Sequence, residues 1–125
     1  MQQNYPTADT DVLVNGLYQL GVCYYQRGNN ETDPQAKQLA FQNASSTAQK
    51  VLDQDVSPEN NISAAYTIGL AKEALGDSNG AIAAYNIATS FEGQTDDAGR
   101  IDLIFQSHSR LAELYSNTGK DAQAV

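Results

Sequence analysis

The chain of 125 residues is predicted to fold as an all-α domain, and three observations support this. Apolar residues recur at steps of three and four, which is the spacing of one helix face. No segment alternates apolar and polar residues for long enough to form a good strand. The pairs Asp33-Pro34 and Ser57-Pro58 are typical of helix starts, because proline at the first helical position loses no hydrogen bond.

The first predicted helix follows a polar segment, residues 1–8, that we expect to be disordered. Thr10 or Asp11 is suited to cap it, and Arg27 followed by Gly28 predicts its end. Its apolar stripe consists of Leu13, Val14, Leu17, Leu20, Gly21, Tyr24 and Tyr25.

The second helix is expected from Pro34 to about Asp55, with Asp33 as its cap. Its stripe is narrow and rich in small residues: Ala36, Leu39, Ala40, Ala44, Ala48, Val51 and Leu52. After the cap Ser57, a third helix is expected from Pro58 to about Leu75.

The remaining helices follow glycine-containing turns. Asp77 is expected to start a fourth helix that ends near Phe91. Thr95 is suited to cap a fifth helix, which carries Ile101, Ile104, Phe105, Leu111, Ala112, Leu114 and Tyr115 and stops at Gly119. Asp121 then caps a truncated sixth helix before the chain ends at Val125.

One stretch, residues 68–88, predicts a helical hairpin around Gly76-Asp77. Gly69 and Ala81 are small enough to let its two helices approach closely. The same internal spacing occurs three times, as Leu20-Gly21-x-x-Tyr24-x-x-x-Gly28, Ile68-Gly69-x-x-Lys72-x-x-x-Gly76 and Leu111-Ala112-x-x-Tyr115-x-x-x-Gly119. This pattern resembles the tetratricopeptide repeat (TPR), a helix–turn–helix unit of about 34 residues.

The resemblance implies a right-handed superhelix of antiparallel helix pairs, with units at about 11–56, 58–92 and 96–125 in a single domain. The chain departs from the family where a large aromatic opens the first helix, because Leu17, Ala65 and His108 stand there. The turn glycines are also 48 and 43 residues apart, more than the family's period of about 34. An unrelated antiparallel helical bundle is the alternative that the same stripes allow.

Composition excludes several classes of partner. The net charge of −8, from 7 basic and 15 acidic residues, argues against nucleic acid and against direct contact with an anionic membrane. No apolar run approaches the ~20 residues of a membrane span. The first ten residues lack a basic or hydrophobic region, so we expect a cytoplasmic protein. The cell envelope or periplasm is the alternative if an upstream signal or span has been removed.

Residues with catalytic or metal-binding potential are few, so we expect no enzyme, no cofactor and no metal site. Cys23 is the one cysteine, and its apolar neighbours predict a buried, unreactive thiol. His108, the one histidine, is expected on the packing side of its helix. Residues 53–57 begin like a calcium loop, but Pro58 stands where that loop requires glycine.

In the TPR family, ligands usually lie in a concave groove lined by the first helix of each pair, which here implies a protein or peptide partner. The candidate groove residues are Tyr18, Val22, Tyr25, Tyr66, Leu70, Glu73, Arg110 and Glu113, accompanied by Gln26, Ser63, Gln106 and Ser109. Tyrosines there combine apolar area with a hydroxyl group, which suits peptide binding, although packing against neighbouring helices explains them equally well.

The partner is expected to be neutral or basic. Family members that bind acidic chaperone tails use a basic and amide clamp, and the matching places here hold Tyr18, Val22, Thr67, Gln106 and Arg110. Of these only Arg110 is basic, so capture of an acidic tail is not expected.

The leading interpretation is a non-catalytic scaffold that binds a protein partner. The alternative is a structural segment of a longer solenoid, or a homodimer through the C-terminal edge. The third unit lacks a second helix, so the fifth helix is expected to expose Ile104, Leu111 and either Leu114 or Tyr115. We therefore expect the chain to be a fragment of a longer protein or to cover this edge by dimerisation.

Overall fold

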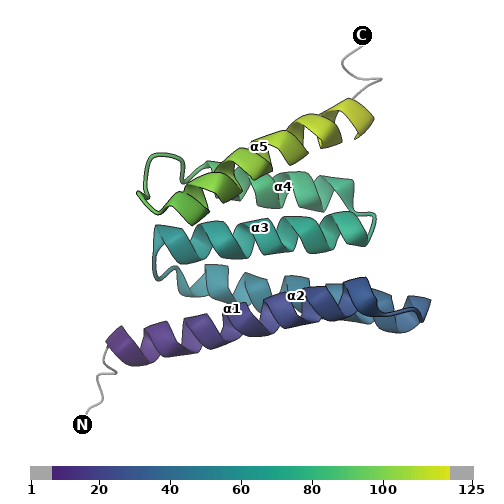
Figure 1. Ribbon diagram of the computed structural model, residues 1–125, viewed down its shortest axis with the longest axis horizontal. Helices are drawn as coiled ribbons and strands as arrows, with labels where there is room; N and C mark the ends of the chain where they lie inside the picture. Colours follow the sequence, from purple (N-terminus) through teal and green to yellow (C-terminus); the bar gives the residue numbers. More distant parts are fainter. Residues whose placement is uncertain (1–6, 119–125) are drawn as a thin grey trace.

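Five α-helices make up residues 7–118, the part of the chain that the computed structural model describes (Figure 1). They are α1 (Thr7–Asn30), α2 (Pro34–Gln54), α3 (Pro58–Ala74), α4 (Ser78–Thr89) and α5 (Ala98–Thr118). This part of the chain contains no strand, which confirms the all-α prediction. The predicted sixth helix lies outside the described residues, as do residues 1–6 of the segment expected to be disordered.

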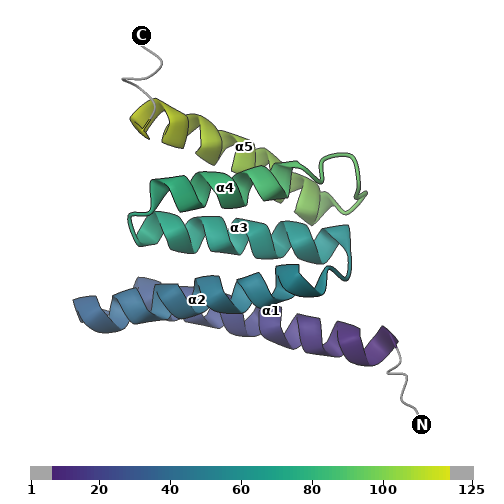
Figure 2. The same ribbon diagram turned by 180° about the vertical axis from the view of Figure 1, so that it is seen from behind.

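Each helix packs against the one before it, and the chain reverses direction between them (Figures 1 and 2). In Figure 1, α1 lies in front of α2 and α5 in front of α4, and Figure 2 shows the reverse side. The central helix α3 contacts the other four. Among the described residues, α3 contacts both α1 and α5, and these two helices lie on the same side of α2 and α4 in Figures 1 and 2, so α1, α3 and α5 share one side of the molecule.

Local capping explains where three helices begin, as predicted. The Asp33 carboxylate accepts a hydrogen bond from the Ala36 N–H at 2.9 Å at the start of α2. The Ser57 hydroxyl accepts the Asn60 N–H at 3.1 Å at the start of α3. Asp77 caps α4 in the same way, directly after Gly76, whose φ of 81° lies in the left-handed region that favours glycine.

The predicted caps of α1 and α5 are wrong. Helix α1 already includes Thr10 and Asp11, because it begins at Thr7. At α5 the Asp97 carboxylate accepts the Arg100 N–H at 3.0 Å, the bond expected of an N-cap. Thr95 supports this turn from outside the helix, since its hydroxyl accepts the Asp97 N–H at 3.1 Å.

Gly28 does not end α1 as predicted, because the helix continues to Asn30. Its role is packing. The Phe41 ring of α2 lies against the Gly28 backbone, so that a β-carbon on Gly28 would stand 2.6 Å from Cε1 of the ring. Phe41, which the predicted stripe of α2 omits, is 2% exposed and is one of the large buried side chains.

The core lies between the helix pairs in two clusters. The first contains Val14, Ala48, Val51, Ala64, Ile68 and Ala84, and the second contains Ala81, Tyr85, Leu111 and Leu114. In the second, the Tyr85 ring lies over Gly69, with Cζ 2.6 Å from where a β-carbon would be. Gly69 thus makes room for a side chain, whereas we predicted a close approach of backbones.

Several stripe residues are exposed, contrary to prediction. Leu20 and Leu39 are 45% and 56% exposed, and the thiol of Cys23 is on the surface. The reason is that α1 and α2 form an edge of the molecule, so one side of each faces solvent (Figure 1). None of the helices described between residues 7 and 118 is long and apolar enough to cross a membrane.

The opposite edge also differs from the prediction. The inner side of α5 buries three apolar residues, Ile104, Leu111 and Leu114. On its outer side, Phe105 is 61% exposed and Tyr115 is 40% exposed. The expected exposure holds for Tyr115 alone, because Leu111 and Leu114 pack with Ala81 and Tyr85 of α4, and Ile104 is buried on the same side of α5.

Candidate functional site

The predicted groove residues all lie on α1, α3 and α5, the helices that share one side of the molecule. We call this set the tyrosine face: Tyr18, Val22, Tyr25, Tyr66, Leu70, Glu73, Arg110 and Glu113. All of them are partly buried except Glu113, which is exposed. Ser63 and Thr67, predicted on the same side, are buried beneath it, where the Thr67 hydroxyl donates to the Ser63 carbonyl at 3.0 Å.

The tyrosines of α1 combine packing with exposure. Tyr18 packs against the first core cluster. The Tyr25 ring is tilted against Phe41 with its centroid 5.6 Å away. Each ring still presents part of its surface to solvent, so its packing does not preclude contact with a partner.

Glu73 and Arg110 form the polar centre of the tyrosine face. The Arg110 Nε donates to Glu73 Oε2 and its Nη2 donates to Oε1, both at 2.8 Å. This bidentate geometry is the strong form of a carboxylate–guanidinium pair, and it joins α5 to α3. The hydrogen bonds with Glu73 raise the pKa of Arg110, so the guanidinium is charged at every physiological pH.

Tyr85, which lies on α4, also belongs to this polar centre. The sequence analysis did not predict a role for it there. Its hydroxyl donates to Glu73 Oε2 at 2.5 Å while its ring fills the space over Gly69. Burial raises the pKa of Tyr85, and the hydrogen bond to Glu73 adds to the shift. The hairpin turn at Gly76 is the signal in the sequence, because it folds α4 back along α3.

Tyr66 extends the network toward the surface. Its hydroxyl donates to Gln106 Oε1 at 2.7 Å, and its ring is tilted against Tyr85 with centroids 5.8 Å apart. Gln106 in turn donates to Asp102 at 2.5 Å. Burial raises the pKa of Tyr66, so the phenol keeps its proton. The face is therefore held together across α3, α4 and α5.

These contacts distinguish the side chains that hold the helices together from those that remain accessible to a partner. Glu73 and Arg110 direct hydrogen bonds to each other, which suits them to holding the helices in place. Glu113, with its side chain 71% exposed and 3.9 Å from Arg110 Nη1, remains accessible. With Asp102 and Gln106 also exposed, the accessible charge on the α5 side of the face is acidic.

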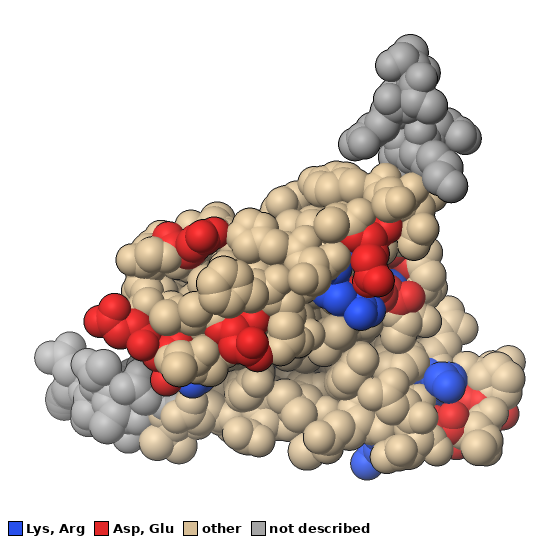
Figure 3. All heavy atoms as spheres, turned by 45° about the horizontal axis from the view of Figure 1, so that its top comes forward, with Lys and Arg blue, Asp and Glu red and all other residues tan. Residues whose placement is uncertain are grey.

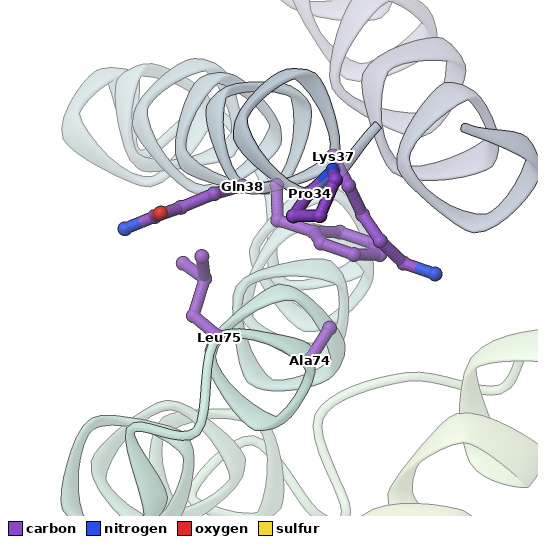
Figure 4. Close-up of a pocket in the computed structure, with 6 residues that line it drawn as sticks. Pro34, Lys37, Gln38, Ala74 and Leu75 are labelled. Carbon is purple, nitrogen blue, oxygen red and sulfur yellow. The ribbon is translucent and has the colours of Figure 1, made fainter. Parts of the chain in front are cut away.

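The hollows on the described residues include three that are lined by residues outside the tyrosine face. One of about 320 Å³ lies where α2 begins and α3 ends, lined by Pro34, Lys37, Gln38, Phe41, Ala74 and Leu75 (Figure 4). A second, of about 280 Å³, lies under Phe105 beside the loop before α5, and a third of about 170 Å³ lies between α1 and α2.

Two further groups of interest are His108 and the acidic side chains outside the tyrosine face. His108 is on the surface, and not on the packing side as predicted, with Nε2 2.9 Å from Glu92 Oε1. No group of three or more acidic, histidine or cysteine side chains between residues 7 and 118 is placed to hold a metal ion. In the view of Figure 3 the acidic side chains form several groups, and no continuous basic patch is visible.

Comparison of the chain with protein-family models, with curated proteins and with solved structures finds no match. The function of the tyrosine face is therefore argued from the geometry of this chain.

Proposed function

We propose that the protein is a non-catalytic scaffold of the TPR type, which binds a peptide or partner protein on the tyrosine face. One observation carries the proposal: α1, α3 and α5 share one side of the molecule and place partly exposed Tyr18, Tyr25 and Tyr66 on it. Partly exposed tyrosines are favoured at interfaces, because a rigid ring supplies apolar area and a hydroxyl group at low entropic cost.

The preferred partner is a neutral or basic segment. Arg110 is paired with Glu73, so it offers little free positive charge to an acidic ligand. Glu113 and Asp102 are exposed acids on the same side, and they favour a lysine- or arginine-bearing peptide through charge complementarity.

Selection of peptides from a displayed random library tests this proposal, with nuclear magnetic resonance used to map where the selected peptides bind. We expect enrichment of basic peptides and shifts centred on Tyr18, Val22 and Leu70. Shifts centred on the hollow beside Lys37, or the absence of any selected binder, would overturn the proposal.

Charge reversal sharpens the test. Glu113→Lys is expected to weaken binding of a basic peptide at least several-fold, mainly at low salt, because a screened surface attraction is lost. Asp53→Lys makes the same charge change on α2, outside the tyrosine face, and is the matched control. Equal loss in both variants would mean that only net charge matters.

A further inference from the structure

Helix α1 has a second apolar face, which consists of Leu13, Gly16, Leu20 and Cys23. Leu13 is 54% exposed and Leu20 is 45% exposed, and all four residues face solvent. At about 100° per residue, Leu20 lies roughly 160° around the helix from Val22. This second face, the α1 outer face, is therefore on the side of α1 opposite the tyrosine face.

The same positions are covered in the other two helices of the pattern. Leu20 corresponds to Ile68 in α3 and to Leu111 in α5, because each stands eight residues before a glycine. The full corresponding sets are Asn61, Ala64, Ile68 and Ala71 in α3, and Ile104, Ser107, Leu111 and Leu114 in α5. Every member of both sets is buried. In α3, Ala64 and Ile68 pack on the preceding helix pair.

Gly16 is an independent indication that a helix covers the α1 outer face. It lies within α1, and a β-carbon added there would meet no atom within 4 Å. Glycine in a helix interior costs about 0.5–1 kcal/mol relative to alanine, and no contact among the described residues explains Gly16. The corresponding Ala64 and Ser107 are fully buried, and Ala64 packs in the core cluster that contains Val14 of α1 and Ala48 of α2. A small residue at such a crossing permits close approach.

We propose that the α1 outer face binds a second copy of this chain, as an antiparallel pair of α1 helices about a two-fold axis near Gly16. Leu13 and Leu20 stand three residues before and four residues after Gly16. In an antiparallel pair, Leu13 of each copy therefore meets Leu20 of the other, while the two Gly16 backbones cross. A two-fold interface of this kind is self-complementary.

Charge favours the same orientation. The one basic residue among the described side chains of α1, Arg27, lies in its last turn. Antiparallel pairing sets the two Arg27 side chains far apart and opposes the two helix dipoles favourably. A parallel pair would place like charges together.

Dimerisation leaves both tyrosine faces free, since they lie on the other side of α1. The assembly would then present two binding faces, and a partner with two recognition segments would bind it with increased avidity. The dimer itself does not depend on the proposed peptide binding, and it is tested separately.

Light scattering coupled to gel filtration tests the oligomeric state of the full chain. We expect a dimer that strengthens with salt, because screening reduces repulsion between copies with a charge of −8 each. Leu13→Glu with Leu20→Glu is expected to raise the dissociation constant at least tenfold without loss of helicity, since both side chains are exposed within one copy. Asn15→Glu, at an exposed position roughly 140–160° around α1 from Leu20 and Leu13, is the matched control.

Cross-linking tests the geometry. In a Cys23→Ser background, Gly16→Cys is expected to form a disulfide-linked dimer on oxidation, because a disulfide requires Cα atoms within about 7 Å. Asn15→Cys should not, because Asn15 points away from the crossing. The proposal is overturned if the wild-type chain is a monomer, if the two cysteine variants cross-link equally, or if Phe105→Glu on α5 dissociates the dimer while the leucine substitutions do not.

Discussion

Two glycines of α1 face α2, and the structure predicts opposite effects for the same substitution at each. Both Gly21 and Gly28 are buried. A β-carbon at Gly21 would lie 3.6 Å from Ala44 O and from Ala48 N, which is ordinary contact. At Gly28 it would lie 2.6–2.8 Å from three carbons of the Phe41 ring. The substitution Gly28→Ala therefore requires Phe41 to move, and Gly21→Ala does not.

The magnitude follows from these distances. Carbon atoms pack favourably at about 3.5–4.0 Å, so the Phe41 ring must move by nearly 1 Å. The ring is buried and packs against Tyr25, and such overpacking typically costs about 1–3 kcal/mol. The higher helix propensity of alanine offsets up to about 1 kcal/mol of this destabilisation. We expect Gly28→Ala to lose about 1–2 kcal/mol, and Gly21→Ala to be neutral or to gain up to about 1 kcal/mol.

Urea unfolding followed by circular dichroism measures both free energies. A destabilisation of this size corresponds to a fall in melting temperature of roughly 4–8 °C for a domain of this length. Adding Phe41→Leu should recover part of the loss in Gly28→Ala, because the ring that obstructs the new methyl group is gone. The reasoning is refuted if Gly28→Ala is as stable as wild type, or if Gly21→Ala is equally destabilising.

Three further predictions concern the other named contacts. A double-mutant cycle of Glu73→Gln and Arg110→Gln should give a coupling of about 1 kcal/mol, and additive effects would mean that the bidentate pair does not stabilise the fold. Because burial raises the pKa of Tyr85, the unfolded chain releases the phenolic proton first. The free energy of unfolding should stay constant below about pH 10, the ordinary pKa of tyrosine, and it should fall above that pH. Tyr85→Phe should flatten that decline in a urea titration. In the Leu13→Glu, Leu20→Glu variant, in which the proposed dimer is dissociated, Cys23 should react with a thiol reagent as fast as an exposed thiol, and a reaction limited by unfolding would contradict its placement.

Several helix starts and ends can be predicted from local sequence signals alone. Asp33 before Pro34 and Ser57 before Pro58 specify their helix starts through bonds within a single turn, and the structure has those bonds. Gly76 ends α3 because its backbone must enter a conformation that other residues avoid. Such signals lie within a few residues of the feature they determine, so sequence reasoning recovers them.

The sequence by itself determined five helices, their order and the cap-and-turn residues between most of them. Only the tertiary structure decided which side of each helix is covered, because that depends on a neighbour distant in sequence. Leu20 and Leu111 occupy equivalent positions, yet one lies on an edge helix in solvent and the other is packed against α4. Likewise, the pairing of Glu73 with Arg110 follows from α5 lying against α3, a contact across 37 residues that no local pattern encodes.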